Sequence, residues 1–257
     1  MKKRLFLILF FAGFAGVVSI LLIDLSALVA FIAASDVPTI TPALKILSLV
    51  QPTVLLGVAV LIGVALASRV GLRAPVAESL AAGNNALPAL RPQLIPGVLG
   101  GAIGALSILL TAAVLTPLLT TQTVQRITKF GTLVPIPTRL LYGGITEELL
   151  LRWGFMTLLV WITWRLFQKR LGKPTSVCFI AAILVSSLVF GLGHLPIAGV
   201  VLPQLTVAVV LFVIVANSAF GVVAGYLYWK YGLESAMIAH ILCHVVLALA
   251  SRAGAYF

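Results

Sequence analysis

The sequence predicts an all-α membrane protein that crosses the bilayer about seven times, within a range of six to eight. Of its 257 residues, 61% are hydrophobic and only 9% are charged, and the mean hydropathy is +1.20. A soluble domain carries about 25% charged residues, so a soluble fold is excluded. Long apolar runs recur along the chain, and a bilayer requires their backbone groups to be hydrogen-bonded within each run, which predicts helices.

Each of these runs is long enough to span a bilayer, which takes about 20 helical residues. They lie at residues 5–34, 44–67, 94–119, 139–164, 175–193, 203–230 and 233–250. The first run is too long for a cleaved signal peptide, whose apolar core is about 7–15 residues, so we expect a retained helix. Asp24 interrupts this run and is expected near the membrane interface.

A polar connection at residues 68–93 separates the first two runs from the third. We expect residues 1–120 to form an N-terminal group of transmembrane helices, and residues 138–250, the last four spans, to form the catalytic core. No internal repeat divides the chain, so both parts are treated as one membrane domain. Small-xxx-small pairs predict close helix packing. They are Gly97 with Gly101, Gly100 with Gly104, and Gly221 with Gly225.

The chain has 17 Lys and Arg against six Asp and Glu, a formal net charge of +11. The basic residues lie in short clusters between apolar runs, which predicts lipid headgroups as their partners and not nucleic acid. With alternating spans, most of them fall on the side of the N-terminus, which predicts a cytoplasmic N-terminus. On that side lie Lys2, Lys3, Arg4, Arg69, Arg73, Arg91, Arg165, Lys169, Arg170, Lys173 and Lys230, and on the other Lys45, Arg126, Lys129, Arg139 and Arg252.

Two adjacent acids, Glu147 and Glu148, lie inside an apolar run, where an ionised residue costs about 2.5–3.5 kcal/mol. Glu148 and Arg152 are four residues apart on one helix face, so we expect them to form a buried pair. That pair either links two helices or supports a site. Glu147 points about 100° away from Glu148. It is either a protonated acid hydrogen-bonded to backbone or a general base in an apolar cavity.

The chain's three histidines also lie within or at the end of apolar runs. His194 follows two glycines and precedes Pro196, so we expect a helix to end there. His240 and His244 are four residues apart and project from one face of the last helix. One such histidine could be a satisfied core residue, but three at membrane depth with a lone acid predict a site.

Glu147, His194, His240 and His244 fit two kinds of site. In the first, Glu147 and His194 deprotonate a water that attacks an amide carbonyl, and ring N–H groups of His240 and His244 donate to the oxyanion. In the second, the same four residues bind a zinc-like ion that activates the water. The HxxxH spacing suits both sites and leaves both open.

These residues resemble, in order, the motifs of the CPBP family, the intramembrane CAAX prenyl endopeptidases of type II and their bacterial relatives, some of them linked to bacteriocin processing or self-immunity. The chain has Glu147-Glu148-x-x-x-Arg152, then Phe190-x-x-x-His194, then His240 with a polar residue at 244. The resemblance covers about residues 138–250.

The resemblance implies a helical fold with a water-filled conical cavity. It implies that Glu147 and His194 activate water, that His240 and position 244 form the oxyanion hole, and that Glu148 and Arg152 support them. The family commonly has Asn or Asp where this chain has His244. A neutral imidazole still donates one hydrogen bond, although the extra histidine makes zinc a more open alternative here than in the usual pattern. No cofactor is otherwise expected.

The predicted function is an intramembrane endopeptidase that hydrolyses a membrane-associated, prenylated or leader peptide by Glu/His-activated water. The expected partners are membrane lipids and a peptide or lipidated protein substrate. The alternatives are a zinc-dependent protease, a non-catalytic immunity or scaffold protein, and a proton-coupled transporter. Alternating spans place His194 and His240 toward opposite faces. Either the helices tilt so that these groups meet, or residues 203–230 break into a re-entrant pair.

Overall fold

The computed structural model describes residues 1–32, 41–169 and 172–254, and within these ranges the chain forms helices and no strand, which confirms the all-α class. Seven helical segments of the described residues are long and apolar enough to cross a membrane. They are Lys2–Leu22, Pro42–Val70, Leu87–Leu118, Ile136–Phe167, Ser176–Val201, Val207–Lys230 and Leu233–Arg252. The protein is therefore an integral multi-pass membrane protein.

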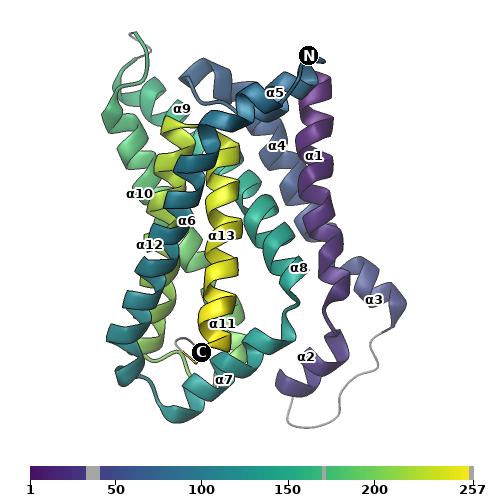
Figure 1. Cartoon of the computed structure of the whole chain (residues 1–257), viewed down its shortest axis with the longest axis vertical. Coiled ribbons are helices and arrows are strands. Elements are labelled where there is room, and N and C mark those ends of the chain that lie inside the picture. The colour runs from purple at the N-terminus through teal and green to yellow at the C-terminus, as the bar shows by residue number, and fades with distance from the viewer. Residues whose placement is uncertain (33–40, 170–171, 255–257) are drawn as a thin grey trace.

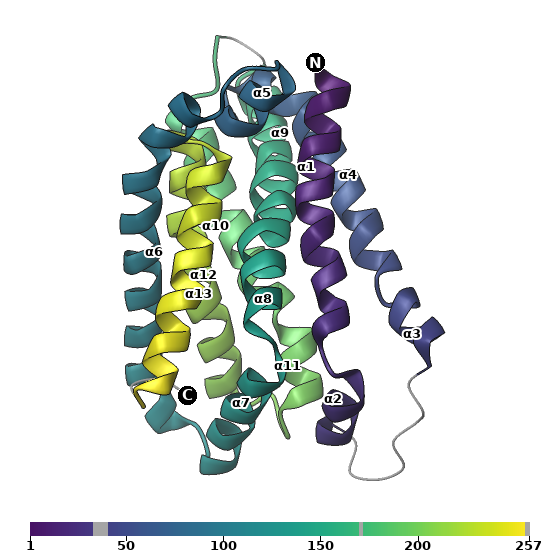
Figure 2. The same cartoon turned by 45° about the vertical axis from the view of Figure 1, so that its right-hand side comes forward.

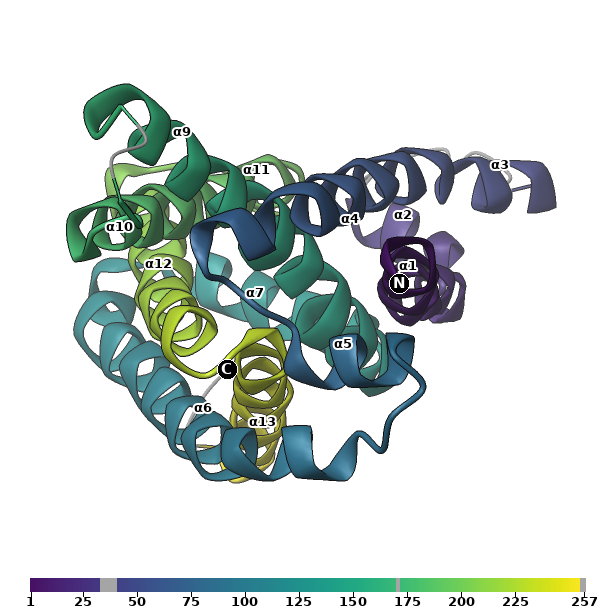
Figure 3. The ribbon, with the colours of Figure 1, turned by 90° about the horizontal axis from the view of Figure 1, so that it is seen from above.

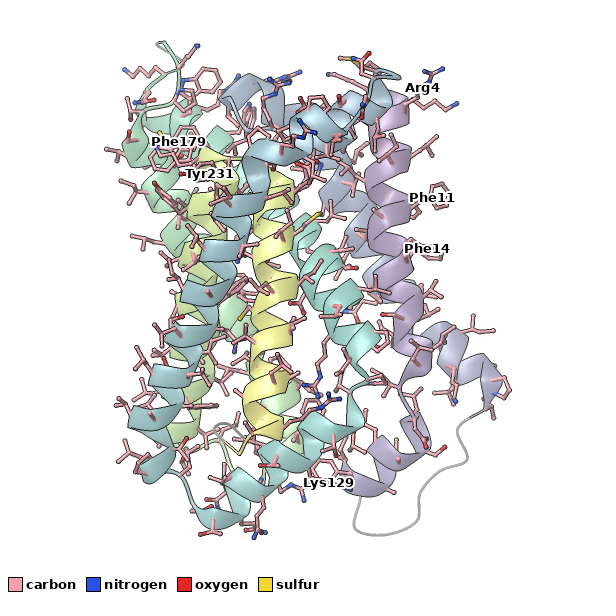
Figure 4. The ribbon with its side chains drawn as sticks, in the orientation of Figure 1. Arg4, Phe11, Phe14, Lys129, Phe179 and Tyr231 are labelled. Carbon is pink, nitrogen blue, oxygen red and sulfur yellow. The ribbon has the colours of Figure 1, made fainter. Side chains whose placement is uncertain are left out.

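The spans run alternately along the long axis of the molecule, with the two termini at opposite ends (Figures 1 and 2). The long helices are α1 (Lys2–Ser19), α4 (Val50–Val70), α6 (Leu87–Leu115), α9 (Thr157–Phe167), α10 (Ser176–Gly193), α12 (Val207–Lys230) and α13 (Leu233–Arg252). Arg4 lies at the end that carries the N-terminus and Lys129 at the other (Figure 4). We call these the N-terminal end and the C-terminal end.

Of the two alternatives for residues 203–230, the re-entrant break is wrong, because α12 is continuous. Pro203 precedes the helix and does not interrupt it, and the Thr206 hydroxyl caps the first turn by accepting from the Val209 amide at 3.3 Å. Asn217 is satisfied inside the helix, where its amide donates to the Val213 carbonyl at 2.8 Å. The last helix therefore returns toward the C-terminal end by simple alternation.

The first apolar run is not one helix, contrary to expectation. Helix α1 ends at Ser19, a 3₁₀ turn follows (η1, Ile20–Leu22), and a separate helix α2 occupies Leu25–Ile32. The exposed Asp24 caps α2, since its Oδ1 accepts from the amides of Ser26 and Ala27 at 3.0 and 3.1 Å. The last two residues of the predicted run lie outside the described residues.

The polar connection at 68–93 is largely helical. It contains α5 (Pro75–Ala81) and the first turns of α6, and Gly71 ends α4 in the left-handed conformation at φ 80°. Helix α5 is tied to the start of α13 by two hydrogen bonds: Glu234 Oε1 accepts from the Ala77 amide at 2.9 Å, and the Leu233 amide donates to the Arg73 carbonyl at 3.1 Å. Seen from the N-terminal end, α5 lies between α13 and α1 (Figure 3).

The glycines of α6 bring this helix close to α12 and α13, as the small-xxx-small pairs predicted. A Cβ added at Gly101 would lie 2.7 Å from the Ala239 carbonyl, and one at Gly104 would lie 2.5 Å from the Phe220 ring. On the other side of α12, a Cβ at Gly221 would lie 2.9 Å from Ser187 in α10. These contacts fix the depth and rotation of α12 and α13.

The fourth span differs most from expectation, because its middle is π-helical and not α-helical. After a short turn, α8 (Ile136–Thr138), the chain forms η3 (Arg139–Glu147) and η4 (Leu149–Met156), separated only by Glu148, and then continues as α9. In a π-helix each amide donates five residues back, which widens the turn. Glu147 therefore ends one widened segment and Glu148 lies between the two, in a conformation that is rare overall and frequent at functional sites.

A layer of short helices closes the C-terminal end. It consists of α2, α3 (Pro42–Leu47), η2 (Thr116–Leu118), α7 (Thr121–Leu133) and α11 (Leu195–Val201). Arg126 of α7 joins two of them, since its guanidinium donates to the Val201 carbonyl of α11 at 2.6 Å and to the Phe31 carbonyl of α2 at 3.0 Å.

Candidate active site

The centre of the site is the carboxylate of Glu148, which bridges two basic side chains. Its Oε2 lies 3.2 Å from Arg152 Nε, so the predicted ion pair is present. Its Oε1 lies 2.8 Å from His240 Nδ1, a contact across 92 positions of sequence that the sequence analysis did not predict. Glu148 and Arg152 are fully buried and His240 nearly so. A carboxylate with two partners offsets its desolvation far better than a single ion pair would.

The guanidinium of Arg152 connects this cluster to α10 and α12. Its Nη2 donates to the Gly221 carbonyl at 3.3 Å, and its Cζ lies 5.2 Å from the centre of the Phe190 ring. Stacking on an aromatic face is a favourable environment for a buried guanidinium. Arg152 thus orients Glu148 and holds three helices in register.

Two aromatic rings enclose His240. The Phe220 centroid lies 4.3 Å from the imidazole centroid, and the Phe190 ring stands edge-on at 5.9 Å. Because a carboxylate only accepts hydrogen bonds, His240 Nδ1 is the donor to Glu148. His240 Nε2 is then the ring nitrogen that can interact with another group. When the ring is an imidazolium paired with Glu148, Nε2 carries a hydrogen and is a second donor.

His194 lies at the end of α10, as predicted, and is partly buried. Its Nδ1 lies 2.8 Å from the Phe190 carbonyl, which can only accept, so Nδ1 carries the hydrogen. Nε2 is left with a lone pair and can accept a proton from water. The Phe190 ring stands edge-on at 4.9 Å from His194, so it separates this imidazole from His240.

His244 stacks on His240, with ring centroids 4.9 Å apart and planes inclined by 15°. On its far side it meets the π-helix at Gly143, where an added Cβ would lie 2.5 Å from His244 Nε2. The next residue, Gly144, admits Ile241 in the same way. The Gly143–Gly144 pair therefore lets α13 approach η3 closely enough to fix the plane of His244.

Glu147 is partly buried and makes no hydrogen bond or ion pair with the described residues. It lies near enough to the phenol of Tyr142 to act on it electrostatically. The structure gives no support to the alternative in which Glu147 is a structural acid, since no hydrogen bond joins its carboxyl group to the backbone of the described residues. Its neighbour Glu148 is fully engaged, so the two adjacent acids differ sharply in their surroundings.

The structure therefore joins Glu148, Arg152, His240 and His244 directly and brings His194 next to them through Phe190. No contact joins Glu147 to an imidazole, although it is the neighbour of Glu148. Sequence reasoning missed Phe220 and Gly143, because an aromatic residue or a glycine in an apolar run carries no signal of its own. The adjacent glycines before the two acids were the one available hint.

A metal would need several of these side chains to converge. Among the described residues, which include Glu147 and all three histidines, no group of three or more His, Cys, Asp or Glu is placed to hold a metal ion. His240 Nδ1 is already engaged by Glu148. The residues as arranged do not form a zinc ligand set, and the reaction proposed for them uses no metal.

The fold and the site define a polytopic helical membrane protein with a buried Glu–Arg–His cluster in its last four spans. Residues 129–246 match the family model of type II CAAX prenyl endopeptidases, Rce1-like. Over this segment the chain is similar to the Rce1-like family, a family of membrane proteases, and the resemblance seen in its motifs is confirmed. A search of curated proteins and one of solved structures found no significant match.

Proposed function

We propose that the protein is an intramembrane endopeptidase that cleaves a membrane-associated peptide with a Glu-activated water. The observation that carries the proposal is the contrast between the two acids: Glu148 is buried and bridges Arg152 and His240, whereas Glu147 is partly exposed and makes no hydrogen bond or ion pair with the described part of the chain. A carboxylate kept unpaired beside a rigid charged cluster is suited to accept and return a proton.

In the proposed reaction Glu147 and the lone pair of His194 Nε2 hold a water molecule, and Glu147 takes its proton as the oxygen attacks the scissile carbonyl carbon. The oxyanion that forms accepts hydrogen bonds from His240 Nε2 and His244. When the C–N bond breaks, protonated Glu147 returns the proton to the leaving amine. General-base catalysis contributes about 10²–10⁴ in rate and a preorganised oxyanion donor about 10²–10³.

Glu148 and Arg152 position the donors and do not touch the substrate in this scheme. Glu148 supports the imidazolium of His240 that donation from Nε2 requires, and Arg152 fixes Glu148. The proposed substrate class is a prenylated or leader peptide presented at the bilayer, supported by the apolar surroundings of the site and by the family. We also propose a cytoplasmic N-terminus, on the strength of the basic residues at that end.

The test uses purified full-length protein and a fluorogenic peptide in two matched forms, one farnesylated near its C-terminus and one not. We expect Glu147→Gln and His194→Ala to lower the cleavage rate by at least about 10². Asp24→Asn is the matched control, because it makes the same acid-to-amide change at an exposed cap. Cleavage at the wild-type rate by both folded site variants would overturn the mechanism. Absence of cleavage by the wild type on a broad peptide library would favour the scaffold or transporter alternatives.

A further inference from the structure

A cavity of ≈ 690 Å³ lies at the N-terminal end, away from the proposed catalytic residues. It opens to the outside and is lined by the starts of α1 and α6, the end of α4, the helix α5, and one side chain of η4. Small residues of α4 create the space, among them Gly63, Ala67 and Ser68. The cavity is therefore part of the way the front spans pack and is not a surface irregularity.

The inner wall of the cavity is apolar. Its floor is the indole of Trp153, which is buried and donates from Nε1 to the Val60 carbonyl at 3.3 Å. Leu5, Val64 and Leu72 complete the wall. Gly63 lies about 10 Å from the end of α4 at Val70, at a rise of ~1.5 Å per residue, so the cavity reaches into the depth of a lipid's acyl chains.

The mouth of the cavity is cationic. Lys2 and Arg73 line it, and the exposed Lys3, Arg4 and Arg69 lie next to lining residues in the sequence. The acid that lines the mouth, Glu78, accepts from Arg73 Nε at 2.8 Å and from Arg73 Nη2 at 2.6 Å. The Arg73–Glu78 ion pair does not use Arg73 Nη1. This atom and the neighbouring basic side chains are available to bind an anion.

Helix α5 forms one side of the cavity. It is held on the far side by Glu234, which accepts from the Ala77 amide, and by the contact of Gly232 with Pro75, where an added Cβ would lie 2.6 Å from the proline ring. These contacts anchor α5 to α13, and α5 also packs on α1, so it bridges these two helices beside the cavity.

We propose that this cavity binds one phospholipid with an anionic headgroup, its acyl chain against Leu5 and Val64, above the buried Trp153, and its phosphate at Lys2 and Arg73. An apolar interior with a cationic rim at a membrane interface matches an amphiphile of this kind, and basic pockets between transmembrane helices bind anionic headgroups. The site is independent of the proposed proteolysis, since it shares no residue with the proposed catalytic set.

The experiment follows the fluorescence of Trp153. A variant with Trp161, Trp164 and Trp229 changed to Phe retains Trp153 as its single indole. It is placed in nanodiscs that contain increasing fractions of phosphatidylglycerol or phosphatidylcholine with brominated acyl chains, which quench indoles that lie close to them. We expect brominated phosphatidylglycerol to quench Trp153 at a markedly lower fraction than brominated phosphatidylcholine.

Two changes separate the roles of rim and interior. Lys2→Gln should raise the fraction of phosphatidylglycerol needed for half-quenching about fivefold, since a basic residue near the surface contributes about 1 kcal/mol to attraction of anionic lipid. Ser68→Phe should fill the cavity and abolish quenching by both lipids. The matched controls are Lys129→Gln at the C-terminal end and Leu110→Phe on the exposed face of α6, which should change nothing.

Equal quenching by the two lipids, or quenching that survives Ser68→Phe, would overturn the proposal. If the single-indole variant does not fold, native mass spectrometry of the otherwise unaltered protein gives a second measurement. One phosphatidylglycerol should remain bound to it and be lost in Ser68→Phe, and retention by both forms would count equally against the site.

Discussion

The two halves of the molecule handle polar groups in opposite ways. In the last four spans, Glu148, Arg152 and His240 are buried and satisfy one another. In the front spans, the long helices α1 and α4 bury apolar or small residues, and charges remain at the N-terminal end. The comparison teaches that glycine-mediated packing is common to both halves, whereas a buried, paired charge cluster is added in the last four spans.

The largest expected effect comes from breaking the charge cluster. Glu148→Ala leaves the guanidinium of Arg152 buried without a carboxylate, which should destabilise the protein by about 3–5 kcal/mol. Asp24→Ala removes only an exposed helix cap and should cost about 1 kcal/mol. Thermal unfolding in detergent, together with the yield of folded protein, measures both.

The double variant Glu148→Ala/Arg152→Met should recover most of the lost stability, because it leaves no unpaired buried charge. It should remain inactive, since His240 has lost the group that supports its imidazolium. Equal stability of Glu148→Ala and the wild type would show that the cluster does not stabilise the last four spans.

The parts of the site that could be predicted are those fixed by local geometry. The Glu148–Arg152 pair follows from a spacing of four residues, and the end of α10 at His194 follows from the glycines and proline around it. The contact of Glu148 with His240 joins residues 92 positions apart, so it depends on how α13 packs against the fourth span. No periodicity in either segment encodes that distance.

The fold was predictable to the level of helix number and alternation, because bilayer thickness sets the length of a span. The places where the observed fold differs from the prediction have local causes. Asp24 accepts two amides and so starts a new helix where hydropathy alone predicted continuity. The π-helix of η3 and η4 escaped prediction because its residues have the same apolar character as an α-helix. The re-entrant alternative for residues 203–230 fails because Pro203 lies before α12 and does not interrupt it.

A medium effect is expected at the contact between the π-helix and the last imidazole. Gly143→Ala places a methyl group 2.5 Å from His244 Nε2, so His244 must move. Displacement of a catalytic group by about 1 Å can cost roughly 10² in rate, and overpacking costs about 1–3 kcal/mol in stability. We expect the cleavage rate of the farnesylated or unmodified peptide to fall by that order, and thermal unfolding measures the accompanying loss of stability.

The matched rescue is Gly143→Ala/His244→Asn, which shortens the side chain that the new methyl group meets and keeps a hydrogen-bond donor. It should unfold at a higher temperature than Gly143→Ala alone and regain part of the rate. Two results together would contradict the role assigned to Gly143. The first is full activity of Gly143→Ala alone, and the second is an equal loss of cleavage rate in His244→Asn and in Gly143→Ala/His244→Asn.

The smallest effect is expected in the front spans, where two glycines of the same helix should respond with opposite signs. A Cβ at Gly57 would meet nothing closer than Phe10 at 3.8 Å, so Gly57→Ala should raise the free energy of unfolding by about 0.5–1 kcal/mol through helix propensity. A Cβ at Gly63 would overlap the Trp153 ring, so Gly63→Ala should lower it by about 1–3 kcal/mol. Thermal unfolding of the two variants side by side gives the sign of each change. Because both glycines lie in α4 and differ chiefly in what faces them, two shifts of the same sign would mean that close packing on Trp153 does not determine stability in this half.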